Sequence, residues 1–432
     1  MTEVATPARR VALDALISVS RGGPTLAQRL AQPDVEALSS RDRAFLHELV
    51  LGTLRTRGSL DHALAACLDQ PLARLDRPLR EILRLGAHQL LHLRVPARAA
   101  VHESVELAHA LAPRASGLVN AVLRKLAATG APRFPEPLAD PLAWLTTEGS
   151  LPEWLARRWM QRLGPERAVA RARALLAPPP LVFRLNPRHA DAMEKLASAG
   201  VDPEPLRVPG AWTGRQAPQS LAMDGVLYVQ DQGAQLVAQL AAVPGKLLDA
   251  CAAPGGKSTL MADLVAGRGW VAAGEASLPR LASLAALARR WGCDNLLVVA
   301  ADAQRPPFRG AFDGVLLDAP CSGLGTLGRH PDIRWRTEPD DLLRHRDRQR
   351  ALLGSLAPLV KAGGRLTYST CSTEPEENEQ VLGPFLADHP HFVPAPLPAW
   401  AAAFRDGDLV RTSPERDGGD GFTCAVLERR LL

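Results

Sequence analysis

Short apolar runs alternate with amphipathic segments through the second half of the chain, and this alternation is the strongest constraint on the fold. The runs are rich in leucine, valine and alanine, and they lie at residues 246–251, 270–276, 295–302, 312–320 and 364–371. Segments with apolar residues at helical spacing separate them, among them 256–267, 278–292 and 341–360. Continuous apolar strands separated by helices predict an α/β domain whose parallel sheet is covered on both faces.

Polar and nucleophilic residues follow each predicted strand of this domain. They lie at residues 249–257, 275, 302, 318–321 and 370–371. Ligands of parallel α/β sheets bind at the carboxyl ends of the strands, beside the point where the strand order reverses. The sequence therefore predicts that these residues share one site at that edge of the sheet.

The stretch CAAPGGKST, Cys251–Thr259, is similar to a phosphate-binding loop but lacks the first glycine of that loop. The Walker pattern needs a glycine five residues before its second glycine, and Cys251 occupies that position. Gly255 and Gly256 still allow the backbone to approach a ligand, and a helix that begins at Ser258 or Thr259 would direct its N-terminal amides there. A P-loop nucleotidase is thus the weaker alternative.

Two acidic residues end the next two strands. Glu275 lies about 20 residues beyond the glycine turn, where dinucleotide-binding folds place an acid on the ribose hydroxyls. Asp302 ends the third strand and could meet an adenine edge. Each acid alone could simply cap a turn. The glycine turn, Glu275 and Asp302 follow three successive strands, however, and together they indicate a nucleoside ligand.

Two cysteines and an aspartate follow the fourth and fifth strands. Asp318 and Cys321 emerge together, and Cys371 precedes the acids Glu374, Glu376 and Glu377. Buried cysteines are usually apolar fillers, and Asp318 could cap the following turn. The acids would discourage a thiolate, or they could form the first turn of a helix. Two thiols and a carboxylate beside a nucleoside site nevertheless favour covalent chemistry.

The first part of the chain has a different pattern. Residues 5–128 are predicted to be helical throughout and, with no strands to pack on, to form a helical bundle. Prolines at 130–150 indicate a linker, and the helices and β-like run that follow indicate a small α+β insert. We therefore expect domains at 1–135, 136–230 and 231–432.

Composition limits the class of protein. The 432 residues carry a formal net charge of +5, which is mildly consistent with a polyanionic partner. No apolar run approaches the roughly 20 residues of a membrane span. Six cysteines without a C-x-x-C pair argue against zinc and against a disulfide framework, and predict reduced thiols in the cytoplasm.

Three motifs resemble one family. DACAAPGGKS, LLDAPCSGLGTLGRHPDIRW and YSTCSTEPEEN are similar to the Nop/Sun class of RNA cytosine-C5 methyltransferases. The helical part, with RRVALDAL, RDRAFLHELVLGTLR and GLVNAVLRKL, resembles the NusB-type RNA-binding domain of the bacterial RsmB branch. The resemblance implies a Rossmann-like class I methyltransferase domain. It also implies S-adenosylmethionine as cofactor, 16S ribosomal RNA as partner, and a monomer without a metal.

The resemblance also assigns roles to residues. The residues expected around the cofactor are Cys251, Ala252, Ala253, Pro254, Gly255, Gly256 and Lys257, with Glu275 at the ribose and Asp302 at the adenine. Asp318 would lie between cofactor and target base. Cys371 matches the nucleophile and Cys321 the cysteine associated with product release, although spacing alone does not decide which thiol attacks.

The implied chemistry uses both thiols. Carbon 5 of cytosine is a poor nucleophile, and addition of a thiolate at carbon 6 makes the ring an enamine that can attack a methyl group. Asp318 could protonate or hydrogen-bond ring nitrogen N3. Amino-group methyltransferases typically carry an N/D-P-P-Y/F stretch where this chain has DAPC, which favours carbon methylation over that alternative. A non-catalytic RNA-binding assembly factor is the remaining alternative.

Two residues outside these motifs have two interpretations. Arg184 and Asn186 match a family stretch near RNA, but structural hydrogen bonding explains such residues equally well. Lys257 could contact the cofactor carboxylate or RNA, or be a solvated residue at a helix start.

Overall fold

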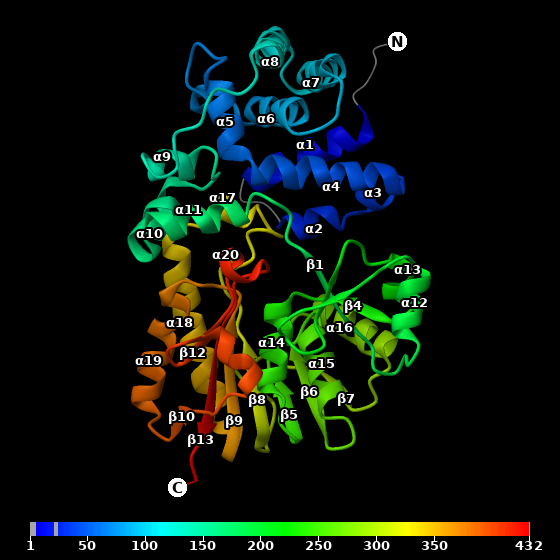
Figure 1. The fold of residues 1–432 in the computed structure, drawn as a ribbon, viewed down its shortest axis with the longest axis vertical. Helices are drawn as coiled ribbons and strands as arrows, with labels where there is room; N and C mark the ends of the chain where they lie inside the picture. Colours follow the sequence, from blue (N-terminus) through cyan, green and yellow to red (C-terminus); the bar gives the residue numbers. More distant parts are fainter. Residues whose placement is uncertain (1–5, 21–24, 432) are drawn as a thin grey trace. The chain divides into compact units, whose positions relative to one another are not determined.

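The computed structural model describes residues 6–20 and 25–431. Contacts divide the chain into two compact units. The helical unit comprises Met1–Pro178 and Leu327–Thr337, and the sheet unit comprises Pro179–Thr326 and Glu338–Leu432. Figure 1 shows the elements of each unit. The three-domain boundaries expected from the sequence stay a prediction.

The helical unit confirms the predicted bundle over the described part of residues 5–128; residue 5 and residues 21–24 lie outside the described residues. Its elements are α1 (Pro7–Ser20), α2 (Leu26–Leu30), α3 (Pro33–Glu36), α4 (Ser40–Arg55), α5 (Arg57–Ala65), η1 (Leu72–Arg74), α6 (Arg77–Leu91), α7 (Ala97–Leu111), η2 (Pro113–Ala115), α8 (Ser116–Thr129), α9 (Pro141–Thr146), α10 (Glu153–Leu163), α11 (Pro165–Ala174) and α17 (Ile333–Arg336). Helix α9 lies inside the expected linker, because Trp144 and Leu145 are buried and Asp140 caps the first turn.

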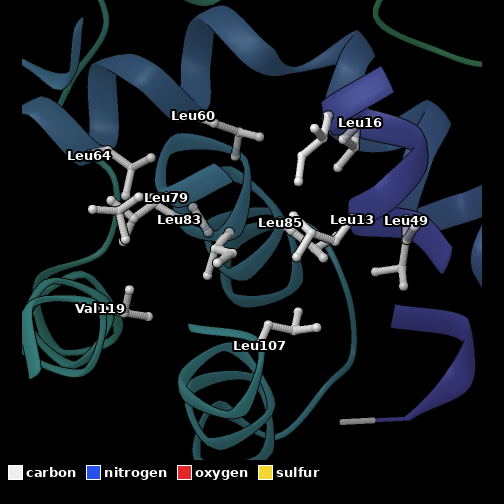
Figure 2. Close-up of a cluster of buried hydrophobic side chains, with 14 of the residues drawn as sticks. Leu13, Leu16, Leu49, Leu60, Leu64, Leu79, Leu83, Leu85, Leu107 and Val119 are labelled. Carbon is white, nitrogen blue, oxygen red and sulfur yellow. The ribbon is translucent and has the colours of Figure 1, made fainter. Parts of the chain in front are cut away.

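Leucines at helical spacing form the core of this unit. Figure 2 shows them converging from α1, α4, α5, α6, α7 and α8. None of the labelled side chains is more than 5% exposed. Burial of each such side chain stabilises the fold by roughly 1.5–3 kcal/mol, so the apolar stripes of the helices explain the bundle.

A buried histidine lies within this core. His88 of α6 packs on Gly52 of α4, where an added Cβ would lie 2.2 Å from the imidazole Nε2. Nε2 has no hydrogen-bond partner among the described residues. Burial, and then the nearby His92 and Arg55, lower the pKa of His88 from 6.5 to about 3.

The segment Leu327–Thr337 belongs to the helical unit, although the sequence analysis treated it as the second half of one catalytic motif. The guanidinium of Arg334 is fully buried and donates to the carbonyls of Ser150 and Leu327 at 3.0 and 3.2 Å. Trp335 Nε1 donates to the carbonyl of Leu54 at 2.7 Å. Because the acceptors are backbone carbonyls, no pattern of charged residues in the sequence could have predicted the contacts of Arg334 and Trp335.

The sheet unit begins with a small antiparallel sheet in the order β2-β3-β1-β4. Its elements are β1 (Leu181–Leu185), α12 (Ala192–Ser198), β2 (Glu204–Pro205), β3 (Trp212–Gly214), α13 (Gln219–Met223) and β4 (Leu227–Val229). Arg184 is buried and donates to Gln230 and Thr259, and Asn186 donates to the carbonyls of Gly225 and Trp291. Both side chains therefore follow the structural interpretation.

The main sheet has nine strands in the order β11-β12-β13-β9-β8-β5-β6-β7, with β10 paired to β13. Its strands are β5 (Gly245–Asp249), β6 (Gly269–Glu275), β7 (Leu296–Ala300), β8 (Phe312–Asp318), β9 (Val360–Thr370), β10 (Phe392–Pro394), β11 (Arg405–Asp406), β12 (Leu409–Arg411) and β13 (Thr423–Arg429). Strands β5 to β9 pair in parallel. The prediction of a parallel sheet was wrong for β10 to β13, which pair antiparallel. Strand β13 starts opposite the last residue of β9, so the chain re-enters the sheet from the edge at which it left.

Helices cover both faces of the main sheet, as predicted. They are α14 (Gln232–Ala241), α15 (Gly256–Leu264), α16 (Leu278–Trp291), α18 (Pro339–Leu356), α19 (Glu379–Asp388) and α20 (Pro414–Asp417), with the short turns η3 (Ala357–Leu359), η4 (Pro375–Glu377) and η5 (Ala399–Phe404). On β5, Leu247 joins the core cluster of α14 to α16 and Leu248 joins that of α18 and α19. Alternate strand residues thus face opposite layers. None of the described helices is long and apolar enough to cross a membrane.

We expect acidification to destabilise the helical unit through His88. The unfolded chain takes up a proton near pH 6.5, whereas folded His88 stays neutral to about pH 3, so stability falls as pH drops through this window. Between pH 7 and pH 5 the loss is about 2 kcal/mol. Urea unfolding followed by helical circular dichroism at several pH values measures it. His88→Leu should lose this part of the pH dependence, and identical slopes in both proteins would contradict the assignment.

Candidate active site

The predicted site residues meet at one edge of the main sheet. Asp249, Glu275 and Asp318 are the last residues of β5, β6 and β8, and Cys371 follows the last residue of β9. Because these strands are parallel, all four side chains emerge at the same edge. Asp302 lies two residues beyond β7 and is exposed.

The glycine turn joins β5 to α15. Gly255 is the N-cap of α15 with φ 109°, a backbone conformation that favours glycine. A Cβ on Gly256 would lie 2.7 Å from the Tyr228 ring, so this position also needs glycine. The helix begins at Gly256, two residues before the predicted Ser258, because the left-handed residue at 255 already directs the chain into the first turn. Ala252 and Ala253 are buried beneath the turn.

Cys251 and Pro254 are two further residues of the turn. Cys251 is half-buried, and burial is the main reason that its pKa rises to about 12. Pro254 follows a cis peptide bond with Ala253. Burial therefore keeps the Cys251 thiol protonated at neutral pH.

Asp249 is a buried acid that the sequence analysis placed among the strand-end residues without giving it a role. Its Oδ2 accepts a hydrogen bond from Ser258 at 2.6 Å, and its Oδ1 has no partner among the described residues. Burial raises the pKa of this carboxyl to about 6, despite the Ser258 hydrogen bond. Its place at the end of the strand, two residues before the turn begins at Cys251, was the signal that could have assigned it a role.

Lys257 and Asp318 form an ion pair in the centre of the site. Lys257 Nζ lies 2.7 Å from Asp318 Oδ2, and Ser369 Oγ donates to Asp318 Oδ1 at 2.7 Å. Burial by itself would lower the pKa of Lys257, but the Asp318 carboxylate more than offsets it and the pKa is raised. The lysine is therefore a fixed positive charge and not a solvated residue at a helix start.

The two cysteines predicted for chemistry lie together. Cys321 Sγ and Cys371 Sγ are 3.1 Å apart, and both thiols are free. The pKa of Cys321 is raised well above its usual value by the hydrogen bond with Cys371, by burial and by the charges of Cys371, Glu377 and Asp318. One thiol of the pair thus favours the protonated state.

Glu275 and Asp302 both make capping contacts. Glu275 is 6% exposed, accepts from the Ser277 amide at 2.9 Å and lies 3.3 Å from Arg280 Nη1. Asp302 Oδ1 accepts from the Gln304 amide at 2.9 Å. The capping interpretation of each residue is therefore correct, and each carboxylate retains further acceptor capacity at the strand ends.

The residues at this edge suit a ligand with a positive centre and hydroxyl groups. Asp249, Glu275, Asp302 and Asp318 supply acceptor oxygens, and Asp249 Oδ1 is a buried acceptor with no partner. S-adenosylmethionine carries a sulfonium, an ammonium and a ribose diol, which match these oxygens, and a carboxylate, which matches Lys257. No group of three His, Cys, Asp or Glu side chains that could hold a metal occurs within residues 6–20 and 25–431.

We expect Gly325→Ala to displace the loop that carries Cys321. A Cβ on Gly325 would lie 1.8 Å from the carbonyl oxygen of Gly421 and 2.9 Å from that of Cys371. The clash is with backbone, so the free energy of unfolding should fall by about 1–3 kcal/mol. Gly354→Ala on α18 is the control, since a Cβ there meets nothing within 4 Å. Urea denaturation measures the free energy of unfolding, and equal values for the two variants would refute this packing argument.

Sequence comparisons identify both halves of the chain. The family description "16S rRNA methyltransferase RsmB/F" matches residues 239–428, and "NusB family" matches residues 6–128. The "Probable ribosomal RNA small subunit methyltransferase B" of Bacillus subtilis is 34% identical, over 98% of this chain and 99% of its own length. The "Ribosomal RNA small subunit methyltransferase B" of Pseudomonas putida is 34% identical, over 97% and 98%.

Solved structures share the fold. The crystal structure of PH0851 is 26% identical and covers 98% of this chain and 99% of its own, with a TM-score of 0.78. NSun6 from Pyrococcus horikoshii, solved with the S-adenosylmethionine analogue SFG, covers 65% of this chain and 99% of its own, at 18% identity and a TM-score of 0.58. S-adenosylmethionine is the cofactor of the family. The chain belongs to the RsmB/F family of 16S ribosomal RNA methyltransferases and carries a domain of the NusB family.

Proposed function

We propose that this enzyme methylates carbon 5 of a cytosine in 16S ribosomal RNA through a transient bond between Cys371 and carbon 6 of the base. The observation that carries the proposal is the pair of free thiols 3.1 Å apart beside the Lys257–Asp318 ion pair. Methyl transfer to oxygen or to an amino group needs no thiol. A nucleophilic sulfur is needed where the acceptor is an unreactive ring carbon.

The chemistry follows from the base. Addition of a thiolate to carbon 6 breaks the 5,6 double bond and places electron density on carbon 5, which can then accept a methyl group. The bound cofactor supplies that methyl group. Loss of the carbon 5 proton to a base then restores the double bond, and cleavage of the carbon 6–sulfur bond releases the cysteine. The enzyme must therefore hold one attacking sulfur and one group for release.

Local charge supports the assignment of the two sulfurs. The Lys257 ammonium interacts electrostatically with Cys371 and would stabilise negative charge on that sulfur during attack. Cys321 instead lies near the carboxylates of Glu377 and Asp318, which oppose a second negative charge. Cys321 can donate its S–H to the Cys371 sulfur across the 3.1 Å contact. We accordingly assign attack to Cys371. Product release is assigned to Cys321: once the Cys371 sulfur is bonded to carbon 6 and carries no charge, Cys321 would lose its proton to solvent and, as a thiolate, accept the carbon 5 proton.

Asp318 is assigned to the target base. The Lys257 ammonium and the Ser369 hydroxyl fix its carboxyl group at the end of β8, three residues before Cys321. An ionised carboxylate only accepts hydrogen bonds, so in this position it would accept one from ring nitrogen N3 once N3 has taken up a proton from solvent, as negative charge develops there during attack. The adjoining ammonium keeps the carboxylate ionised and acts on Cys371 as well, so the ion pair serves the base and the attacking sulfur together.

The strand-end residues are assigned to the cofactor. The turn from Cys251 to Lys257 would surround it, with the N-terminal amides of α15 and the Lys257 ammonium near its carboxylate. Glu275 would accept hydrogen bonds from the ribose hydroxyls, and Asp302 would face the adenine.

Bisulfite sequencing of 16S ribosomal RNA from cells with and without the protein tests the reaction. An unchanged pattern of 5-methylcytosine would refute it.

Replacing each thiol should separate attack from release. Cys371→Ala removes the attacking sulfur, so it should abolish methyl transfer to RNA while S-adenosylhomocysteine still binds. Cys321→Ala removes the release group, so a covalent protein–RNA complex should accumulate and persist as a shifted band on a denaturing gel. Cys293→Ala serves as the control, since Cys293 is not part of the thiol pair. A shifted band from Cys371→Ala, with none from Cys321→Ala, would reverse the assignment.

Loss of the Glu275 carboxylate should weaken cofactor binding. Glu275→Ala removes a charged hydrogen-bond acceptor, which costs roughly 1–3 kcal/mol, or a 5- to 150-fold weaker affinity. Calorimetric titration with S-adenosylhomocysteine measures it. Glu428→Ala on β13 is a control carboxylate that lies far from the end of β6 in the strand order. An equal affinity in both variants would remove Glu275 from the ribose position.

A further inference from the structure

Glu377 and Asn378 are two consecutive polar residues that follow Cys371 in the chain and have no role in the proposed function. Glu377 is the last residue of η4, and Asn378 precedes α19. The sequence analysis interpreted the acids of this stretch as thiolate-discouraging charges or as the first turn of a helix. In the structure both side chains are fully buried, and each reaches a different cysteine-bearing loop.

Glu377 contacts the loop that carries Cys321. Its Oε1 accepts from the Ser322 amide at 2.7 Å, and its Oε2 accepts from the Ser322 hydroxyl at 2.5 Å. Gln349 Nε2 of α18 donates to Glu377 Oε1 at 3.3 Å and to the carbonyl of Pro320 at 3.0 Å. Both neighbours of Cys321 in the chain are therefore held by Glu377 and its partner Gln349.

Asn378 contacts the turn that carries Cys371. Its Oδ1 accepts from the Thr370 hydroxyl at 2.8 Å, and its Nδ2 donates to the carbonyls of Ser372 and Glu374 at 3.1 and 2.8 Å. Thr370 and Ser372 are the neighbours of Cys371 in the chain. Asn378 therefore holds both chain neighbours of Cys371, as Glu377 and Gln349 hold those of Cys321.

The charge of Glu377 has a consequence of its own. Its three hydrogen-bond donors are neutral, and no Lys, Arg or His side chain of the described residues forms an ion pair with it. A buried carboxylate without a cation is costly, and a glutamine would fit the same space. Besides Glu377, the groups that act on the Cys321 sulfur are Cys371 and Asp318. The charge of Glu377 thus adds to the negative groups that raise the pKa of Cys321.

We propose that Glu377 and Asn378 are the positioning residues of the two-thiol centre, with Asn378 fixing Cys371 for attack and Glu377 fixing Cys321 for product release. The inference rests on the proposed function for the two steps. The placement itself rests on six hydrogen bonds: three accepted by Glu377, and three made by Asn378. Because the two residues are consecutive, one short backbone segment sets the distance between the sulfurs.

The first test follows the covalent complex on denaturing gels with a 16S ribosomal RNA transcript and S-adenosylmethionine. Glu377→Ala should accumulate the complex, as Cys321→Ala does, because release slows by on the order of 100-fold when a reacting group is displaced. Asn378→Ala should form little complex, as Cys371→Ala does, because attack slows instead. Glu379→Ala is the matched control, since this neighbouring acid is partly exposed and pairs with Arg411 away from the thiols.

The second test needs no RNA. Phenylarsine oxide joins two neighbouring thiols to one arsenic and releases water, so the rate at which it bridges Cys321 and Cys371 reports their placement. Mass spectrometry identifies the bridged peptides, and Cys371→Ala gives the background. Glu377→Ala and Asn378→Ala should both bridge more slowly than the wild type, while Glu379→Ala should match it.

The outcomes distinguish this inference from the proposed function. If neither the wild type nor the Cys321→Ala variant forms a covalent complex, the proposed function fails. The phenylarsine oxide reaction still tests the placement of the two thiols. If both variants match the wild type in complex formation, release and bridging rate, the positioning role is overturned. Binding of S-adenosylhomocysteine checks folding. Where an alanine variant fails that check, Glu377→Leu, which cannot accept the three hydrogen bonds, or Asn378→Asp, which cannot donate to the two carbonyls, replaces it, and wild-type behaviour of these variants overturns the proposal equally.

Discussion

Parallel pairing of β8 with β9 is the constraint on which the site depends. Asp318 of β8 lies opposite Ser369 of β9, so the two strands end at the same edge of the sheet. This register brings Cys321 and Cys371 to 3.1 Å although 50 residues separate them in sequence. It also lets Ser369 donate to Asp318. A shift by one residue would turn alternate side chains to the opposite face, so the apolar alternation that fixes the sheet also fixes the centre.

Within that geometry, charge distinguishes two chemically identical thiols. A single buried lysine faces Asp318 and acts on Cys371, whereas carboxylates act on Cys321. The hydrogen bonds of Glu377 and Asn378 hold the loops on which the two sulfurs lie. Placement and local charge are thus set by the same few side chains. This agrees with a reaction in which one sulfur must attack and the other must wait. Glu377 and Asn378, the last two residues of the PEEN stretch, contact the loops of both sulfurs.

The segment after the catalytic loop shows that a sequence motif need not be one structural element. The chain leaves the sheet unit after Thr326 and continues in the helical unit from Leu327. There, Arg334 donates to backbone carbonyls instead of acids, and its pKa falls to about 9 because burial disfavours the charge. Ser150, which offers one of these carbonyls, has a φ of 53°, a conformation that is uncommon outside glycine. The helical unit thus includes a strained, buried polar contact that its amphipathic stripes do not encode.

The sequence by itself determined the helical bundle, the parallel core of the sheet, the glycine turn and the order of chemical groups along the strand ends. These are local properties, since they follow from the periodicity of apolar residues and from motifs that lie within a few residues of each other. Tertiary structure decided the rest. It placed β13 antiparallel, buried Arg184 and Asn186 in structural contacts, and joined Glu377 to Ser322 across 55 residues. Such contacts depend on which chain segments become neighbours, and a buried hydrogen bond between distant polar residues leaves no periodic signal in either segment.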